Sequence, residues 1–379
     1  MSSWFSQLSS TVSNAAGLVT VDSIKTISDT VKDGQYYTPL DQKDLEWTLA
    51  SGSSTENQVF YTTSRKGAFA FVQLIHSNIG LWNPTISFTC RFYDPETKTS
   101  FFKTISMTKF DLSSDRCSVK TDFFSIQLDA AQNLYRINIT HPQVVVSLEF
   151  KRIDKGFKVG EGKTFLGGDD AKSAGFVSHK FWPRAESKGT FIIDQQIHDI
   201  EGEGIFIHAI QGMQPQLIAT HWNFVDFHSN EASINMMQFK TTKQYGSVSI
   251  NQGSLVLNDK LVCVCVDNHL ELLDLERDPE TEYDVPKRIK LTWKGKTIKE
   301  QGEVKDVNIT MLGETKNLLD KIDVLAEIPF VVRKIVQTFV VKPYIYQWLD
   351  QVKAEITIGD KTIVTEGHCF QELVFVSKF

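Results

Sequence analysis

The sequence predicts a mostly β fold made of two barrel-like domains, and three observations support this prediction. Short runs rich in Phe, Val, Ile and Thr alternate apolar and polar residues with a period of two, the pattern of half-buried strands. At 379 residues the chain is longer than one hydrophobic core usually organises. The runs GAFAFVQLIHSN from Gly67 and GIFIHAIQGMQP from Gly204 share an order of features that suggests a duplicated domain, with chance similarity as the alternative.

The composition limits the possible classes of function. With 41% hydrophobic and 23% charged residues, the chain lies in the globular range. The net charge of −6, without a cluster of Lys and Arg, argues against a nucleic-acid partner. No window approaches the roughly 18 apolar residues of a membrane-spanning helix, so we expect peripheral membrane contact at most. We expect a monomer.

The chain has five cysteines, an odd number without paired spacing, and its N-terminus lacks the layout of a secretory signal. We therefore expect a reducing compartment. Cys263 and Cys265 would share one face of a strand, where metal binding or oxidant sensing is the alternative to the more common role of buried thiols. The sequence lacks the motifs of phosphate, zinc and nucleophile-elbow sites, so we expect no metal, no cofactor and no catalytic residue.

The first expected element is an amphipathic helix at the N-terminus. Residues 2–21 carry no charged side chain, and their apolar residues recur at helical spacing. At about 100° per residue these residues occupy an arc of about 160° opposite a Ser-rich face, which is typical of helices that insert into lipid-packing defects. Docking on the protein's own body is the alternative. The residues expected to contact the membrane are Trp4, Phe5, Leu8, Val12, Leu18 and Val19.

The expected domains follow from where the strand-like runs begin and repeat. We assign residues 1–33 to the helix and its linker, 34–185 to the first β domain and 186–379 to the second. Within the first domain, segment 159–175 is rich in Gly and charged residues, which predicts a long surface loop.

Toward the C-terminus the spacing of apolar residues changes. Between 317 and 341 apolar residues recur at intervals of three and four, and Pro329 would interrupt the pattern, which predicts a short helical segment. The alternating runs on either side of the Gly359-Asp360 turn then predict a closing hairpin.

The densest mixture of polar and aromatic residues is HWNFVDFHS, residues 221–229. In a strand, Trp222, Phe224 and Asp226 would share one face. A carboxylate beside two aromatic rings, in a cavity of low dielectric, would bond a lipid hydroxyl or amide, or protonate an alkene. An Asp that faces solvent or bonds backbone amides is the alternative. We place the cavity in the second domain, with ligand-binding residues Phe206, His208, Gln211, Trp222, Phe224 and Asp226.

The runs GAFAFVQLIHSN and IHAIQGMQP, followed by HWNFVDFHS and QYGSVSINQG, resemble the fungal survival-factor family of tandem lipocalin-like proteins. The resemblance covers nearly the whole chain, and the helix around Trp4 matches the membrane-binding start of that family. It implies two tandem lipocalin-like barrels in a non-enzymatic cytoplasmic protein. This protein would bind ceramide or a related lipid and carry it between endoplasmic reticulum and Golgi membranes. It would associate with those membranes peripherally, with the nucleus as a further location, and support survival under oxidative stress.

Three functions stay open at this point. A lipid carrier needs a cavity that shields acyl chains and a few polar groups that read the headgroup. A hydratase or isomerase acting on an apolar lipid or isoprenoid would use Asp226 and a neighbouring His as acid and base. The resemblance of the family to bacterial carotenoid hydratases implies this alternative. A stress-signalling scaffold would fill its barrels with its own side chains. The carrier is our leading hypothesis.

Overall fold

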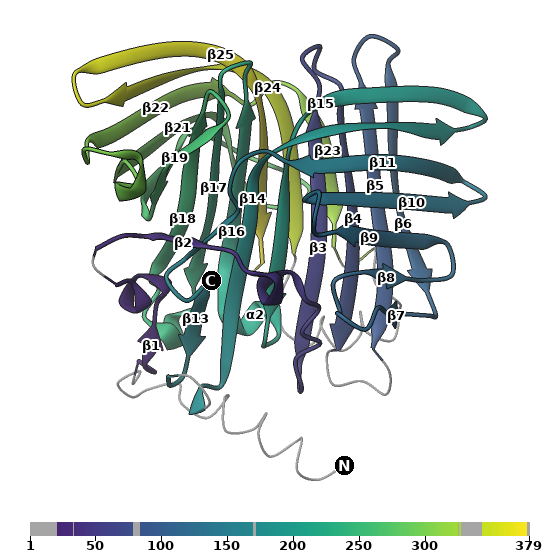
Figure 1. Cartoon of the computed structure of the whole chain (residues 1–379), viewed down its shortest axis with the longest axis horizontal. Helices are drawn as coiled ribbons and strands as arrows, with labels where there is room; N and C mark the ends of the chain where they lie inside the picture. Colours follow the sequence, from purple (N-terminus) through teal and green to yellow (C-terminus); the bar gives the residue numbers. More distant parts are fainter. Residues whose placement is uncertain are drawn as a thin grey trace.

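The computed structural model describes residues 21–32, 34–78, 84–169, 172–324, 326 and 343–376. Within these ranges almost all regular structure is β. The strands pair antiparallel into one 15-stranded and one 10-stranded sheet, and both sheets are curled (Figure 1). The prediction of a mostly β fold is confirmed. The helix expected at the N-terminus lies outside the described residues.

The first sheet contains all described strands up to β15. Its main path runs in the order β6-β5-β4-β3-β15-β14-β11-β10-β9-β8-β7, while β12 and β13 pair with part of β14 and are joined by β2 and β1. The strands are β1 (Ile24–Lys25), β2 (Tyr37–Pro39), β3 (Ser54–Thr63), β4 (Phe69–Asn78), β5 (Thr85–Asp94), β6 (Thr99–Met107), β7 (Asp111–Leu112), β8 (Val119–Lys120), β9 (Phe124–Asp129), β10 (Leu134–His141), β11 (Val144–Arg152), β12 (Phe157–Val159), β13 (Lys163–Leu166), β14 (Gly175–Ile193) and β15 (Gln196–Gln211).

The second sheet contains the remaining described strands. Its path runs β19-β18-β17-β16-β25-β24-β22-β21-β20, and β23 pairs with β24. The strands are β16 (Ala219–His228), β17 (Ala232–Thr241), β18 (Ser249–Leu257), β19 (Lys260–Cys265), β20 (Asp267–Arg277), β21 (Asp284–Lys296), β22 (Asp306–Glu314), β23 (Leu318–Asp323), β24 (Tyr344–Ile358) and β25 (Lys361–Phe375).

Short helical turns connect the strands of the described chain. The α-helix α2 lies where the chain passes from the first sheet to the second, between β15 and β16. These turns are α2 (Pro215–Ile218) and the 3-10 turns η1 (Ile27–Thr30), η2 (Gln42–Leu45), η4 (Lys243–Tyr245) and η5 (Lys299–Gln301).

A bend in β14 lets the first sheet fold over itself. The register between β14 and β15 shifts between Trp182 and Ala185. Pro183 lies at this point and cannot donate a ladder hydrogen bond, which favours a bulge that bends the strand. Before the bend β14 pairs with β12 and β13, and after it with β11. As a result β9, β10 and β11 cross β3 to β6 steeply in Figure 1.

The chain changes sheets later than we expected. Strand β14 runs through 185 and 186 without interruption, and β15 pairs with β3 of the first sheet as far as Gln211. The expected domain boundary between 185 and 186 therefore lies inside a strand of the first sheet. Alternation along the sequence reveals the strands but not their partners, and here the partner of β15 lies far back in the chain.

The predicted closing hairpin is confirmed. Strands β24 and β25 pair over their full length around a turn at Gly359, where φ is +56°. This left-handed conformation has no steric cost for glycine. Strand β25 also pairs with β16 and thereby joins the two ends of the second sheet's sequence.

Two local expectations were wrong. Residues 318–323 form β23 rather than a helix, because they pair with β24. Residues 325 and 327–341 of the expected helical segment lie outside the described residues. Segment 159–175 is not one surface loop, since β13 lies within it and its Thr164 and Leu166 are buried against β14.

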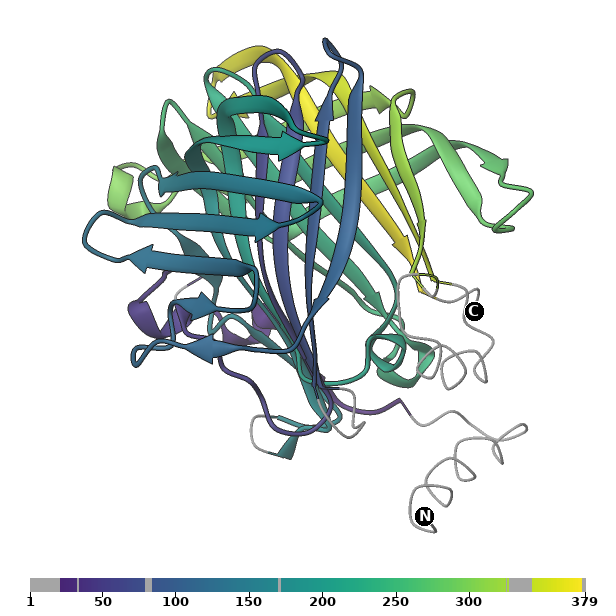
Figure 2. The same ribbon diagram turned by 90° about the vertical axis from the view of Figure 1, so that its right-hand side faces the viewer.

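Buried apolar side chains form three layers. The inner core of the first sheet includes Trp47, Phe60, Phe88, Tyr135 and Phe150. The inner core of the second sheet includes Phe227, Met236, Trp293, Met311 and Trp348. The third layer lies between the two sheets, where Figure 2 shows β3 to β6 beside the yellow strands β24 and β25.

Candidate functional site

The layer between the two sheets is rich in aromatic rings, and we call it the inter-sheet layer. Tyr61 of the first sheet lies 5.1 Å from Phe224 and 5.5 Å from Phe370 of the second, measured between ring centroids. Such walls are typical of sites for apolar ligands. The larger buried members of the layer are Val59, Tyr61, Phe69, Phe71, Ile205, Ile207, Trp222, Phe224, Phe239, Ile250, Leu349 and Phe370.

Alternation along β16 decides which side chains enter this layer. Trp222 and Phe224 face the first sheet, whereas Val225 and Phe227 point into the inner core of the second sheet. The sequence predicted correctly that Trp222 and Phe224 share a face. It did not predict that this face looks toward the first sheet, so our placement of a cavity inside the second domain was wrong for these two residues.

Two predicted ligand residues lie in the first sheet instead. Phe206 packs against Phe60 in the inner core, with ring centroids 4.8 Å apart. His208 is fully buried, with Nε2 2.7 Å from Glu56 Oε1 and Nδ1 3.0 Å from the carbonyl oxygen of Asp44. Because a carbonyl only accepts, Nδ1 donates this bond. Both ring nitrogens of His208 are therefore used to join β15 to β3 and η2.

Glu56 is the charged partner in this arrangement. Burial alone would raise the pKa of its carboxyl. The hydrogen bond and charge of His208, together with the backbone amides of Thr48 and Leu49 at 2.8 and 2.7 Å, outweigh burial and lower this pKa. Both ring nitrogens of His208 and both carboxylate oxygens of Glu56 have hydrogen-bond partners within the protein, which indicates a structural role.

The six predicted ligand residues thus do not converge on one cavity. Gln211 ends β15, half-buried and in register with Thr55 and Val177. The structure distributes the six among four places: Phe206 and His208 in the first sheet's interior, Gln211 at the end of β15, Trp222 and Phe224 in the inter-sheet layer, and Asp226 in a buried polar network.

That network begins at Asp226, on the same face of β16 as Trp222. Asp226 Oδ2 lies 3.0 Å from His228 Nε2, and His228 Nδ1 lies 2.7 Å from Ser233 Oγ. Both nitrogens of His228 are therefore engaged. The other oxygen of Asp226, Oδ1, is buried and has no hydrogen-bond partner among the described residues. A buried acceptor without a partner is costly unless a ligand or water completes it.

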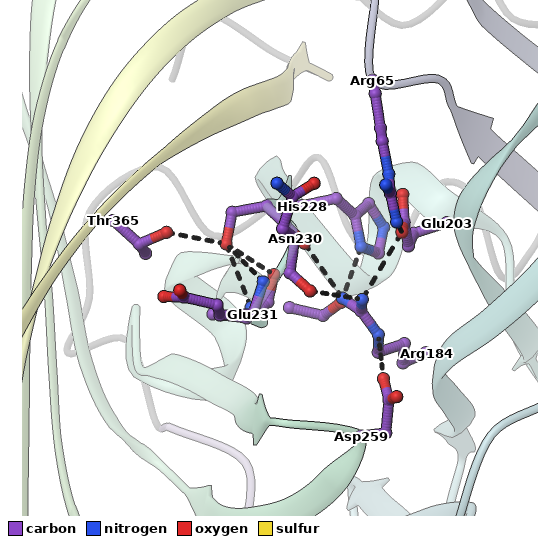
Figure 3. Close-up of polar contacts among 11 residues, drawn as sticks. Arg65, Arg184, Glu203, His228, Asn230, Glu231, Asp259 and Thr365 are labelled. Carbon is purple, nitrogen blue, oxygen red and sulfur yellow. Dashed lines mark hydrogen bonds and ion pairs between the residues drawn. The ribbon is translucent and has the colours of Figure 1, made fainter.

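Arg184 of β14 links this network to the first sheet (Figure 3). Its guanidinium donates to Ser233 Oγ at 2.8 Å and to Asp259 Oδ1 at 3.0 Å, and it lies 3.5 Å from Glu203 Oε1. Two backbone carbonyls of the β16–β17 turn accept further bonds. We did not predict this residue, although an Arg directly after Trp-Pro within an apolar run is the signal that would have revealed it.

A second polar group lies at the edge of the inter-sheet layer, and we call it the Arg91 cluster. It consists of Arg91, Asp320, Gln347 and Glu372. Arg91 is 1% exposed, forms an ion pair with Asp320 and lies 4.9 Å from the centroid of the Phe102 ring. Gln347 Nε2 donates to Glu372 Oε2 at 2.7 Å, while Gln347 Oε1 is buried without a partner in the described part of the chain.

Burial sets the protonation of Glu372. It raises the pKa of this carboxyl, and the hydrogen bond from Gln347 and the charge of Arg91 oppose the rise without cancelling it. A raised pKa favours the neutral acid, which can donate as well as accept a hydrogen bond. Sequence reasoning missed the cluster. Its only local signals are a charged residue inside TISFTCRFYD and another inside FQELVFV.

Two surface grooves lie outside the inter-sheet layer, and both contain charged side chains. The larger, of about 570 Å³, is lined by Ser147, Glu149, Lys188, Gly189, Thr190, Asp199, Ile200 and Glu201. The smaller, of about 350 Å³, is lined by Gly34, Gln35, Tyr36, Tyr37, Val264, Asp267, Lys294, Gly295, Lys296 and Ile298. Mixed charges of this kind suit alkyl chains less well than the inter-sheet layer.

Among the described residues, no helix is both long and apolar enough to cross a membrane. Nor do His, Cys, Asp and Glu side chains in the same part of the chain form a group of three or more placed to hold a metal ion. All five cysteines are free and buried. A hydrogen bond with the thiol of Cys263, together with burial, raises the pKa of Cys265.

Comparison with known sequences gives consistent matches over the whole chain. A family model described as the Svf1 family matches residues 1–377. The ceramide-binding protein svf1 of Schizosaccharomyces pombe is 32% identical over 361 residues, covering 94% of each chain. The ceramide-binding protein svf-1 of Neurospora crassa is 31% identical over 363 residues, again 94% of each chain.

Comparison with solved structures shows a shared fold at low identity. CghA bound to Sch210972 matches with a TM-score of 0.63 at 11% identity, over 94% of this chain and 99% of that one. Kievitone hydratase from Nectria haematococca matches with a TM-score of 0.56 at 12% identity, over 94% and 99%. A putative AttH from Nitrosomonas europaea matches with a TM-score of 0.58 at 12% identity, over 89% and 98%.

Proposed function

The chain belongs to the Svf1 family, and from this membership we propose that it binds ceramide in the inter-sheet layer and carries it between membranes. The observation that carries the proposal is an aromatic layer that also contains buried polar atoms without partners among the described residues. Ceramide combines two alkyl chains with a head of hydroxyl groups and one amide. The layer offers apolar walls for the chains and unpaired acceptors for the head.

The alkyl chains of ceramide would supply most of the affinity. Each methylene removed from water contributes roughly 0.8 kcal/mol, so two long chains supply far more than a few hydrogen bonds. The hydrogen bonds contribute selectivity, because Gln347 Oε1 has no partner among the described residues and gains one from a lipid donor. No group has to transfer a proton, so a binding role requires no enzyme chemistry.

Carrying ceramide also requires contact with membranes. Our proposal assigns this contact to Trp4, Phe5, Leu8, Val12, Leu18 and Val19, which lie outside the described residues. In this proposal the protein is cytoplasmic, associates peripherally with endoplasmic reticulum and Golgi membranes, and moves ceramide between them, with the nucleus as a further location. Survival under oxidative stress would follow from control of free ceramide. The sequence pattern and the family resemblance support these steps.

A hydratase or isomerase is the second candidate, and the Asp226–His228 pair is the observation in its favour. The two groups are 3.0 Å apart and buried, as an acid and a base would be. However, Ser233 Oγ occupies the remaining nitrogen of His228. A histidine bonded on both sides has no free nitrogen for a substrate, so we rank binding above catalysis.

The test is lipid capture and transfer by the whole chain. Native mass spectrometry of the purified protein, with lipid analysis of what it releases, should detect ceramide bound unchanged. Donor vesicles containing labelled ceramide should lose label to acceptor vesicles only when the protein is present. A protein with Trp4 and Phe5 both replaced by Asp should still bind ceramide but transfer it slowly. A wild-type protein that captures no ceramide from vesicles would refute the proposal, and altered lipid in the product would favour the hydratase.

A further inference from the structure

The Arg91 cluster belongs to two rows of side chains that face each other across the inter-sheet layer. Residues paired in an antiparallel sheet point to the same face. On the second sheet Asp320 pairs with Gln347, and Gln347 pairs with Glu372. Glu372 in turn pairs with Phe224. These four side chains therefore form one row across β23, β24, β25 and β16.

The first sheet contributes the opposite row. Phe102 pairs with Arg91, and Arg91 pairs with Phe71. Phe71 then pairs with Tyr61, which completes a row across β6, β5, β4 and β3. Arg91 is the one charged side chain in this row of four. The three aromatic side chains around it place its guanidinium in an apolar setting.

The two rows contact each other at both ends of the second sheet's row, and the contacts differ in kind. At one end Arg91 forms its ion pair with Asp320. At the other end Tyr61 packs against Phe224 at 5.1 Å between ring centroids. The contact between the two rows is therefore polar at one end and aromatic at the other. An amphiphilic lipid has the same division along its length.

Exposure shows which end is nearer to water. The side chain of Asp320 is 32% exposed, whereas Phe224 is 3% exposed. Beside Phe224 on the same face, Trp222 stacks on Phe239 at 4.5 Å. The polar end therefore lies at the rim, and the aromatic end lies deep.

We propose that the Arg91 cluster holds the head of the bound lipid at the rim, with the chains directed toward Phe224 and Trp222, and that it selects an uncharged head over a phosphorylated one. This inference rests on the proposed function. The cluster offers hydroxyl and amide groups several partners: Gln347 Oε1 accepts, and Glu372 as the neutral acid both donates and accepts.

The charges in the cluster explain the exclusion of phosphate. Arg91 alone would attract a phosphate strongly, because a guanidinium binds it with charge-assisted hydrogen bonds. Here Asp320 already neutralises Arg91, and Glu372 as the neutral acid adds no charge that would attract phosphate. A phosphorylated head brings a charge of about −1.5 to −2 into this partly buried position, where repulsion by the Asp320 carboxylate is weakly screened.

The test compares ceramide with its 1-phosphate ester in the wild-type chain and in Asp320→Asn. Binding is measured by displacement of a fluorescent ceramide from the whole protein. The wild-type protein should prefer ceramide. Asp320→Asn removes the neutralising charge, so the ratio of phosphate-ester affinity to ceramide affinity should rise by about tenfold or more. Asp306→Asn, an exposed aspartate on β22, is the matched control and should keep the wild-type preference.

The possible failures can be told apart. If the wild-type protein binds ceramide but Asp320→Asn keeps the wild-type preference, the head lies elsewhere and the inference is overturned while the proposed function stands. If the wild-type protein binds neither lipid, the proposed function itself is wrong. Thermal unfolding of each variant verifies folding. Asp320→Ser, which also removes the charge, replaces Asp320→Asn if the latter does not fold, with the same expected result.

Discussion

The ring of Phe69 in the first sheet stacks on the ring of Phe370 in the second, with centroids 4.4 Å apart and an interplanar angle of 17°. Both side chains are fully buried. The contact joins β4 to β25, which lie far apart in the sequence. The two sheets therefore pack directly on each other at this contact and are not two independent domains.

We predict that the two rings are energetically coupled. Phe69→Ala and Phe370→Ala should each lower the free energy of unfolding by about 3–5 kcal/mol, through lost burial and the cavity left behind. The double mutant should lose about 0.5–1.5 kcal/mol less than the sum of the two single losses, because the first substitution has already removed the contact between the rings. Urea unfolding of the four proteins measures this. Strict additivity would show that the sheets do not depend on this contact.

Substitution of the buried Arg184 should destabilise the protein far more than substitution of the exposed Arg65 in the same network. Arg184→Ala removes the buried guanidinium that donates to Ser233 Oγ and pairs with Glu203, and should cost about 3–5 kcal/mol. Arg65 provides a matched control, because it contacts the same Glu203 at 3.4 Å with a side chain that is 70% exposed. Arg65→Ala should cost about 1 kcal/mol or less. Equal losses in thermal unfolding would contradict our assignment of Arg184 as the organising residue.

Stability should fall as the pH is lowered below 6.5, with His179 as one cause. Burial lowers the pKa of His179 from 6.5 to about 3, and its Nδ1 accepts from Gln252 at 2.7 Å in the neutral form. The unfolded chain binds a proton here between pH 6.5 and 3 while the folded chain does not. The stabilisation is therefore complete above pH 6.5 and is lost toward pH 3, by up to about 1.4 kcal/mol per pH unit.

His179→Gln should flatten this pH dependence, since its side chain still accepts a hydrogen bond but does not titrate. Melting temperatures at pH 7.5, 6 and 5 provide the measurement, with exposed His269→Gln as the control. Burial also lowers the pKa of His76 and of His221, so a smaller dependence in the same direction should remain. An unchanged slope in His179→Gln would show that other groups account for the effect.

Much of the fold could be predicted from the sequence, because the alternation of apolar and polar residues in a strand is a local property. The shared face of Trp222 and Phe224, and the β24–β25 hairpin at Gly359, both follow from neighbours along the chain. Leu318 to Asp323 show the limit of such patterns. Apolar spacing of three and four fits a helix equally well, and only pairing with the distant strand β24 made this segment a strand.

The site was less predictable because it is assembled from distant segments. Arg91 and Asp320 are 229 positions apart, and no local pattern connects them. Alternation identified the face of β16 that holds Trp222, but the direction of that face depends on β3 and β4 packing against it. His208, which we expected to bind ligand, instead forms hydrogen bonds with Glu56 and the carbonyl of Asp44, and both partners are distant in sequence.

The last prediction separates lipid binding from catalysis within the inter-sheet layer. Trp222→Ala should lower ceramide affinity by about tenfold or more, because the ring forms part of the apolar wall with Phe239. Asp226→Asn should bind nearly as well as wild type, since an amide still accepts a hydrogen bond. A hydratase would reverse this order, as the amide cannot transfer a proton and turnover would fall by about 10²-fold or more while binding persisted. Val225→Ala, the neighbouring substitution on the opposite face, should reduce stability without affecting ceramide affinity. Undiminished binding by a folded Trp222→Ala protein would exclude the inter-sheet layer as the lipid site, because this ring lies where the chains must pack.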